Sequence, residues 1–160
     1  MHSPAIQKLI DLFSKFPTVG PRTASRFVFY LMGKNKEEIE EILKSISVLR
    51  DNVKVCPFCF NPYEGADSLC QICSDPRRDK SILCVVANET DFEAIEKTKK
   101  YKGFYFVLGG MEKLRIKELE ERIKSRLEIQ EIILALNPTS EGETAALYLE
   151  RFLRTLNKKI

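Results

Sequence analysis

The chain has 160 residues, of which 44% are hydrophobic and 31% are charged, a balance typical of a globular protein and not of a disordered or fibrous one. No apolar run approaches the roughly 18 residues of a membrane span, and the N-terminus lacks the basic-then-apolar pattern of a signal peptide. The net charge of +3 is modest, and the five cysteines, an odd number, favour reduced thiols over a secreted disulfide framework. An intracellular protein is therefore predicted.

Residues 1–53 are predicted to form a small helical unit. Ser3 is a candidate N-cap before a helix-starting proline, residues 17–21 break that first helix, and a second helix is predicted to end near Met32. Asn35 is a candidate cap for a third helix. The inward face of the third helix is predicted to consist of Ile39, Ile42, Leu43, Ile46 and Leu49.

The break between the first two helices has the layout of a helix-hairpin-helix motif over residues 12–24. A tight hairpin directs backbone N–H groups and the start of the second helix outward, a geometry that receives a phosphate without reading bases. Arg22 and Arg26 lie one helical turn apart, and Lys15 adds a third cation. DNA contact is the functional prediction, and a plain helical turn with exposed basic side chains is the structural alternative.

Four cysteines form the most specific pattern in the chain, C-x2-C-x10-C-x2-C, at Cys56, Cys59, Cys70 and Cys73. Two such pairs in a reduced chain are typical of a structural zinc site, in which four thiolates leave no position open for water. Two disulfides are the alternative. Little regular structure is predicted in residues 54–79, so the metal is expected to supply most of the folding free energy of this segment.

After the cysteines, short apolar runs alternate with helical patterns, which predicts parallel β-α-β units over residues 80–160. Strands are predicted at residues 82–86, 104–108 and 131–136. Helices are predicted at residues 90–100 and 114–127 and from a capping box at Ser140 and Glu143 onward. The last helix should pack through Leu149, Phe152, Leu153 and Leu156, with Lys158 and Lys159 in its final turn. Cys84 lies within the first strand and is predicted to be a core residue.

Acidic side chains follow two of the strands. Glu89 and Asp91 come after the first strand, and Glu141 and Glu143 come after the third. Carboxylates at the carboxyl ends of parallel strands can hold a magnesium ion. The favoured interpretation is that they are helix N-terminal carboxylates, which interact with the helix dipole.

The order of these pieces resembles the RecR family of bacterial recombination mediators, whose α/β part is a Toprim domain. The similarity runs along nearly the whole chain and includes the cysteine quartet. The other matching segments are residues 17–24, 73–79, 83–86, 94–96, 107–110 and 137–143, the last reading Asn-Pro-Thr-x-Glu-Gly-Glu.

The resemblance implies a non-catalytic protein of DNA repair and recombination in the bacterial cytoplasm, associated with the nucleoid. Such proteins bind single- and double-stranded DNA without sequence specificity, act with RecF and RecO, and help load recombinase onto gapped DNA. They assemble through both ends of the chain into dimers and ring-like tetramers. Arg22 and Arg26 fall where the family has basic DNA-contacting positions.

The chain also departs from the family pattern. Thr18 stands where the family has glycine, which predicts a looser hairpin, and Ala87 replaces an acidic residue, so that the acidic Toprim positions are degenerate. An insert that the family carries after the two glycines is absent at residues 109–113. The family's last strand and tail are missing, which weakens the expectation of ring formation.

Two other functions remain open at this point. One is a magnesium-dependent Toprim enzyme fragment of the nuclease or primase type, against which stand Ala87 and the absence of a catalytic constellation around the lone histidine, His2. The other is a protein–protein adaptor that does not bind DNA.

Overall fold

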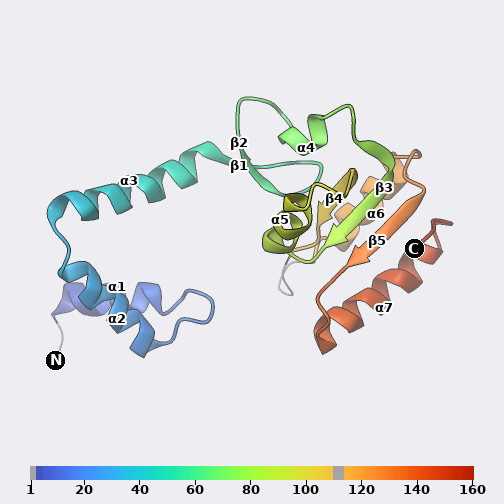
Figure 1. Cartoon of the computed structure of the whole chain (residues 1–160). Coiled ribbons are helices and arrows are strands. Elements are labelled where there is room, and N and C mark those ends of the chain that lie inside the picture. The colour runs from blue at the N-terminus through green and yellow to red at the C-terminus, as the bar shows by residue number, and fades with distance from the viewer. Residues whose placement is uncertain (1–2, 110–113) are drawn as a thin grey trace. The chain divides into compact units, whose positions relative to one another are not determined.

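The computed structural model describes residues 3–109 and 114–160 (Figure 1). The chain divides into two compact units, which we call the N-terminal unit, Met1–Asp51, and the C-terminal unit, Asn52–Ile160. His2 and Gly110, together with most of the segment where the family insert is absent, lie outside the described residues. In the described part of the chain, no helix is long and apolar enough to cross a membrane.

The N-terminal unit contains three helices, α1 (Pro4–Phe13), α2 (Pro21–Met32) and α3 (Lys36–Asn52). The Ser3 hydroxyl accepts a hydrogen bond from the Ile6 amide, so the predicted cap of α1 is confirmed. Asn35 caps α3 in a reciprocal arrangement in which its side chain accepts from the Glu38 amide at 2.8 Å and its own amide donates to the Glu38 carboxylate at 3.1 Å. The residues buried between α1 and α2 are Ile10, Ala24 and Val28.

The predicted inward face of α3 is wrong. None of its residues is buried, and Leu43, Ile46 and Leu49 are each about 60% exposed. The core of this unit is built from α1, the hairpin and α2, and α3 contributes no residue to it. Within the N-terminal unit, α3 therefore carries an apolar face that none of the unit's described residues buries.

The C-terminal unit contains a parallel three-stranded sheet in the order β4-β3-β5. The strands are β3 (Asp79–Val86), β4 (Gly103–Val107) and β5 (Glu131–Ala135), and the helices around them are α5 (Glu89–Lys97), α6 (Ile116–Ser125) and α7 (Ser140–Arg154). The predicted α/β fold class is confirmed. Because side chains alternate along β3, Leu83 and Val85 point to the core shared with α6 and α7. Cys84 and Val86 point to a second core, on the face covered by α5. The prediction that Cys84 is buried is confirmed.

Two predictions about α7 are wrong. Thr139, not Ser140, caps the helix, because its hydroxyl accepts from the Gly142 amide at 3.2 Å while Ser140 is already helical. Lys158 and Lys159 lie beyond the helix. The Lys158 ammonium donates to the Ile129 carbonyl oxygen at 2.6 Å, and Lys159 forms a parallel bridge with Glu131 at the start of β5. Past this bridge, the outer edge of β5 has no strand partner among the described residues.

Candidate metal centre and nucleic-acid interface

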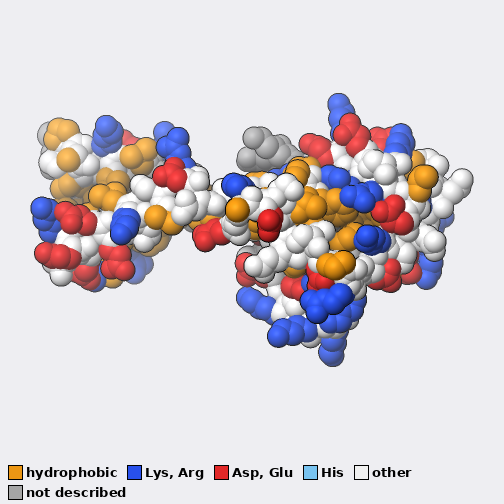
Figure 2. All heavy atoms as spheres, turned by 90° about the horizontal axis from the view of Figure 1, so that it is seen from above, with side chains coloured by type: hydrophobic (Ala, Val, Ile, Leu, Met, Phe, Trp, Pro, Cys, Tyr) orange, Lys and Arg blue, Asp and Glu red, His pale blue; other side chains and the backbone are white. Residues whose placement is uncertain are grey.

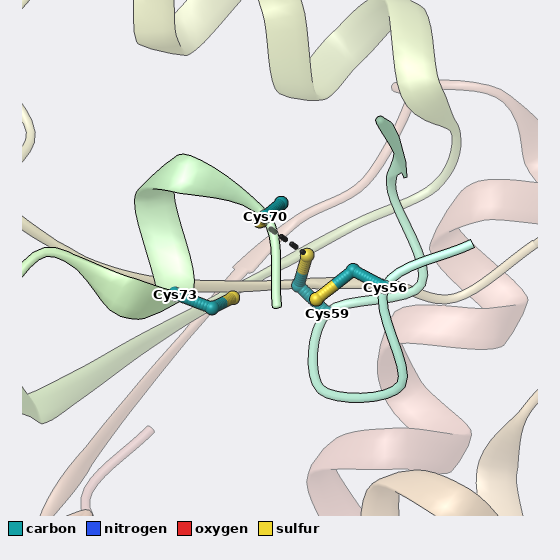
Figure 3. A group of neighbouring side chains, drawn as sticks. All are labelled: Cys56, Cys59, Cys70 and Cys73. Atoms are coloured by element: carbon teal, nitrogen blue, oxygen red, sulfur yellow. Dashed lines mark hydrogen bonds between the residues drawn. The ribbon is translucent and has the colours of Figure 1, made fainter. Parts of the chain in front are cut away.

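The four cysteines converge on one point (Figure 3). Cys56 and Cys59 lie in a tight turn after β1 (Val53–Val55), closed by hydrogen bonds from the Cys56 amide to the Asn61 carbonyl oxygen and from the Phe60 amide to the Cys56 carbonyl oxygen. Cys70 is the N-cap residue of the short helix α4 (Gln71–Ser74), and Cys73 lies within that helix. The four Sγ atoms all lie within 4.8 Å of one another.

The sulfur geometry fits a tetrahedral ion and not disulfides. All four cysteines are free thiols, and the Sγ atoms of Cys59 and Cys70 are 3.6 Å apart. A tetrahedral zinc with Zn–S bonds of about 2.3 Å would place its sulfurs about 3.8 Å apart. Hydrogen bonding from the neighbouring thiols, Cys59 first, lowers the pKa of Cys56 below its ordinary value, and hydrogen bonding with Cys56 raises the pKa of Cys59 and of Cys73. The cluster can therefore hold a metal ion.

The cysteine segment packs against the sheet of the C-terminal unit. The prediction of little regular structure is wrong in part, because β1 pairs with β2 (Pro62–Glu64) in an antiparallel hairpin and α4 follows. The Phe58 ring meets that of Phe104 at a centroid distance of 5.1 Å, and Phe60 meets Phe106 at 5.3 Å, both edge to face. The Val107 amide donates to the Cys59 carbonyl oxygen at 2.8 Å. Shared core packing thus stabilises this segment in addition to any metal.

Three arginines of the α6 region contact the phenylalanines of this segment, and none of them was predicted from the sequence to do so; Arg126 lies 5.3 Å from the Phe58 ring. The Arg122 guanidinium lies 4.4 Å from the centroid of Phe58 and donates to the Pro57 carbonyl oxygen at 2.6 Å. Arg115 lies 4.9 Å from the Phe60 ring and donates to the Val107 carbonyl oxygen at 3.1 Å. The spacing of seven residues between Arg115 and Arg122, which is two helical turns, is the only sequence signal of a shared role for these two. Arg122 also interacts electrostatically with Cys73, Cys56 and Cys59, so it places positive charge close to a cluster that would become anionic on binding a metal.

The hairpin between α1 and α2 presents the predicted basic side chains to solvent. Arg22 and Arg26 are exposed on the first two turns of α2, and Lys15 is exposed in the loop. None of the three forms an ion pair with the described residues. The N-cap of α2 is Gly20, which offers no side chain to the first amides of the helix. The helix start is consequently available to an anion.

The four acidic residues are not brought together as a metal site. Glu89 and Asp91 lie in the first turn of α5, and Glu141 and Glu143 lie in the first turn of α7. Among the described residues, only the cysteine quartet gathers three or more potential metal-ligating side chains of the His, Cys, Asp and Glu types. This arrangement supports the interpretation of these groups as helix N-terminal carboxylates.

Comparison with known proteins gives matches to both units. The family model described as "RecR, helix-hairpin-helix" matches residues 6–49, and the model described as "Toprim domain" matches residues 81–160. A protein of Bifidobacterium adolescentis named "Recombination protein RecR" is 40% identical over 165 residues, which cover 98% of this chain and 81% of that protein. Proteins of the same name from Mycobacterium ulcerans and Nocardia farcinica are each 39% identical, over 98% and 96% of this chain and 82% and 81% of their own lengths.

Proposed function

The chain belongs to the RecR family of recombination proteins, and we propose that it is a non-catalytic DNA-binding protein of recombinational repair that helps load recombinase onto gapped DNA together with RecF and RecO. Residues 1–53 contact DNA, residues 54–79 hold zinc, and residues 80–160 form the Toprim-like part. Its place of action is the bacterial cytoplasm, at the nucleoid.

The observation that carries this proposal is the exposed basic hairpin. Arg22 and Arg26 extend from the first two turns of a helix whose N-terminal amides lack a side-chain cap, and Lys15 lies in the preceding loop. Cations beside free helix amides bind phosphates without reading base edges. The expected affinity is therefore independent of sequence and strongly salt-dependent.

The test is DNA binding by the metal-loaded full chain in which Arg22→Gln and Arg26→Gln are combined. Loss of two phosphate contacts should make the slope of log affinity against log salt shallower by about 2. The matched control combines Lys36→Gln and Lys44→Gln, two exposed positions on α3. Equal affinity and slope in the arginine variant and the unmodified chain would contradict the assignment of these residues.

Zinc is the metal that best fits the cysteine cluster, because four thiolates form a closed, soft, tetrahedral ligand set. A structural role follows from the absence of an open position. Mass spectrometry of the native protein should detect one zinc ion per chain. If the chain purified without zinc binds DNA with full affinity, the proposed structural role is contradicted.

The proposal that the chain is not an enzyme rests on one position after the first strand, where the family carries an acidic residue. That position is Ala87, and the neighbouring Asn88 side chain is engaged in capping α5, since it accepts from the Asp91 amide at 3.0 Å. Magnesium-dependent strand cleavage that Glu141→Gln abolishes would favour the Toprim enzyme instead. DNA binding that is absent even at low salt would favour the adaptor.

Self-association is supported by the uncovered face of α3. Leu43, Ile46 and Leu49 are exposed on one helix of a unit with a small core, and an apolar patch of this kind marks an association surface. A homodimer formed through the N-terminal unit would bury it. Light scattering should report a dimer for the unmodified chain and a monomer for Leu43→Glu combined with Ile46→Glu, whereas an unchanged mass would place the interface elsewhere.

A further inference from the structure

A second basic surface lies on the C-terminal unit, apart from the hairpin. Residues 97–102, which comprise the last residue of α5 and the segment after it, contain four lysines and no acidic residue, and these are Lys97, Lys99, Lys100 and Lys102. Lys99 and Lys102 line a cleft of about 900 Å³ that also borders the cysteine segment. Figure 2 shows Lys and Arg side chains gathered at the lower edge of this unit.

The cleft has a surplus of positive charge, because its acidic groups are already paired. Asp75 accepts two hydrogen bonds of 3.0 Å from the Arg77 guanidinium. Glu96 accepts from Arg78, whose side chain is only 10% exposed and which also donates to the Gly103 carbonyl oxygen. Among the described residues no carboxylate forms an ion pair with Lys99, Lys100 or Lys102. Their charges remain available to a ligand.

The backbone at Lys99 places this lysine at the turn that ends α5. Lys99 follows the C-cap residue of α5 with φ 55, in the left-handed region where glycine or asparagine is the usual residue. This conformation is the usual way in which a helix ends, and it turns the chain away from α5 at Lys99. Lys99 thus lies on the wall of the basic cleft.

We propose that this cleft binds the sugar-phosphate backbone of a nucleic acid, as a contact separate from the hairpin; the inference rests on the proposed DNA-binding function. Lysines are point charges suited to phosphates in any sequence. Base stacking is not available, since the Tyr101 ring packs on Tyr105 at 4.9 Å and its hydroxyl donates to the Phe104 carbonyl oxygen. No lining residue is a large exposed hydrophobic that could anchor a peptide, which favours nucleic acid over an acidic protein.

The test compares two triple variants of the metal-loaded full chain. The cleft variant combines Lys99→Gln, Lys100→Gln and Lys102→Gln. The control combines Lys117→Gln, Lys124→Gln and Arg151→Gln, which removes the same charge at exposed positions elsewhere on the C-terminal unit. Binding to a labelled, mixed-sequence gapped duplex is followed by fluorescence anisotropy at several salt concentrations. The cleft variant should bind roughly tenfold or more weakly at low salt, with a slope shallower by about 2 to 3, and the control should stay within about twofold of the unmodified chain.

Each other outcome has a defined meaning. Equal binding by the cleft variant and the control overturns the inference, while a weakened Arg22 and Arg26 variant in the same experiment leaves the proposed function intact. An unmodified chain that does not bind DNA overturns both. A cleft variant that loses binding to poly-glutamate but not to DNA identifies an acidic-peptide site instead. Replacement of the same three lysines by arginine should preserve affinity, and its loss there would contradict a role based on charge.

Discussion

At the scale of single residues, Thr18 carries strained backbone in the hairpin. Its φ is 64, in the left-handed region that costs a β-branched side chain about 1 to 2 kcal/mol. Thr18→Gly should therefore stabilise the N-terminal unit by about 1 kcal/mol, less the entropy that glycine adds to the unfolded chain. Amide hydrogen exchange in α1 and α2 measures this change as slower exchange. Thr155→Gly, at a residue with φ −66, is the control and should not stabilise the chain; faster exchange in the Thr18 variant would contradict the strain argument.

Gly142 is required by a close backbone approach. A Cβ atom built at this position would lie 2.0 Å from the Asn137 carbonyl oxygen, in the turn that leads into α7. Gly142→Ala should cost about 1 to 3 kcal/mol, because the turn must shift to make room. Chemical denaturation of the C-terminal unit measures the loss. Gly20→Ala is a suitable control, since its Cβ would meet no atom within 4 Å, and an equally small effect at both positions would show that the turn yields freely.

Cys84 should be chemically inert and should make stability fall at alkaline pH. Burial raises the pKa of its thiol from 9.0 to about 11, so at pH 8 only about one thiol in a thousand is ionised. Because folding raises this pKa, the contribution of Cys84 to stability is complete below pH 9.0 and declines as the pH rises toward 11. Iodoacetamide at pH 8 should spare Cys84 in the folded chain and modify it in urea. Rapid modification of the folded chain would show that β3 opens readily.

Residue-scale features could be predicted from the sequence only where their causes are local. The Ser3 and Asn35 caps depend on residues three positions away, and both predictions are confirmed. Thr139 and Ser140 are adjacent hydroxyl residues that can both cap a helix, and the sequence favoured serine, whereas the folded turn uses Thr139. The contact of Arg122 with the carbonyl oxygen of Pro57 spans 65 residues and depends on the folded structure.

At the scale of elements, the cysteine segment packs on the sheet and carries a cluster that can hold a metal ion. Its two phenylalanines lie against β4, and its chain is closed by only a few backbone hydrogen bonds. A bound metal ion would hold the Cys70 and Cys73 pair beside the Cys56 and Cys59 pair. Without the ion, this link between the two pairs is lost. The two ends of the segment should then separate, although the phenylalanine contacts remain favourable.

Metal removal should accordingly loosen this segment before it unfolds the sheet. Chelation is expected to accelerate hydrogen exchange at the amides of β1, β2 and α4, while β3 and β4 keep most of their protection. Exchange measured with and without a chelator, followed by addition of zinc, tests the expectation. Unchanged exchange in the metal-free segment would mean that packing alone holds it, and loss of protection throughout the sheet would make the metal part of the main core.

The sequence predicted every helix and strand of the Toprim-like part because apolar periodicity and chain alternation are strong there. The same periodicity is misleading for α3. Its stripe from Ile39 to Leu49 indicates that one face avoids water, but periodicity does not specify whether that face is buried within the chain or against another molecule. Only the observed α1–α2 core, from which α3 is excluded, shows that the described residues of the N-terminal unit do not bury it.

At the scale of the whole molecule, the division into two compact units has a thermodynamic consequence. The N-terminal unit has three fully buried core residues, whereas the C-terminal unit has a two-sided core and the candidate metal site. Small units with small cores are marginally stable alone. The N-terminal unit should therefore gain much of its stability from covering the apolar face of α3.

Thermal unfolding should show two transitions that respond to different variables. The first, from the N-terminal unit, should rise in temperature with protein concentration, because association stabilises the folded state by mass action, and should not respond to zinc. The second, from the C-terminal unit, should rise with zinc. Calorimetry over a wide range of protein concentration, with and without zinc, separates the two. The Leu43→Glu and Ile46→Glu variant should abolish the concentration dependence of the first transition alone, and a single transition that responds to both variables would show that the two units unfold as one.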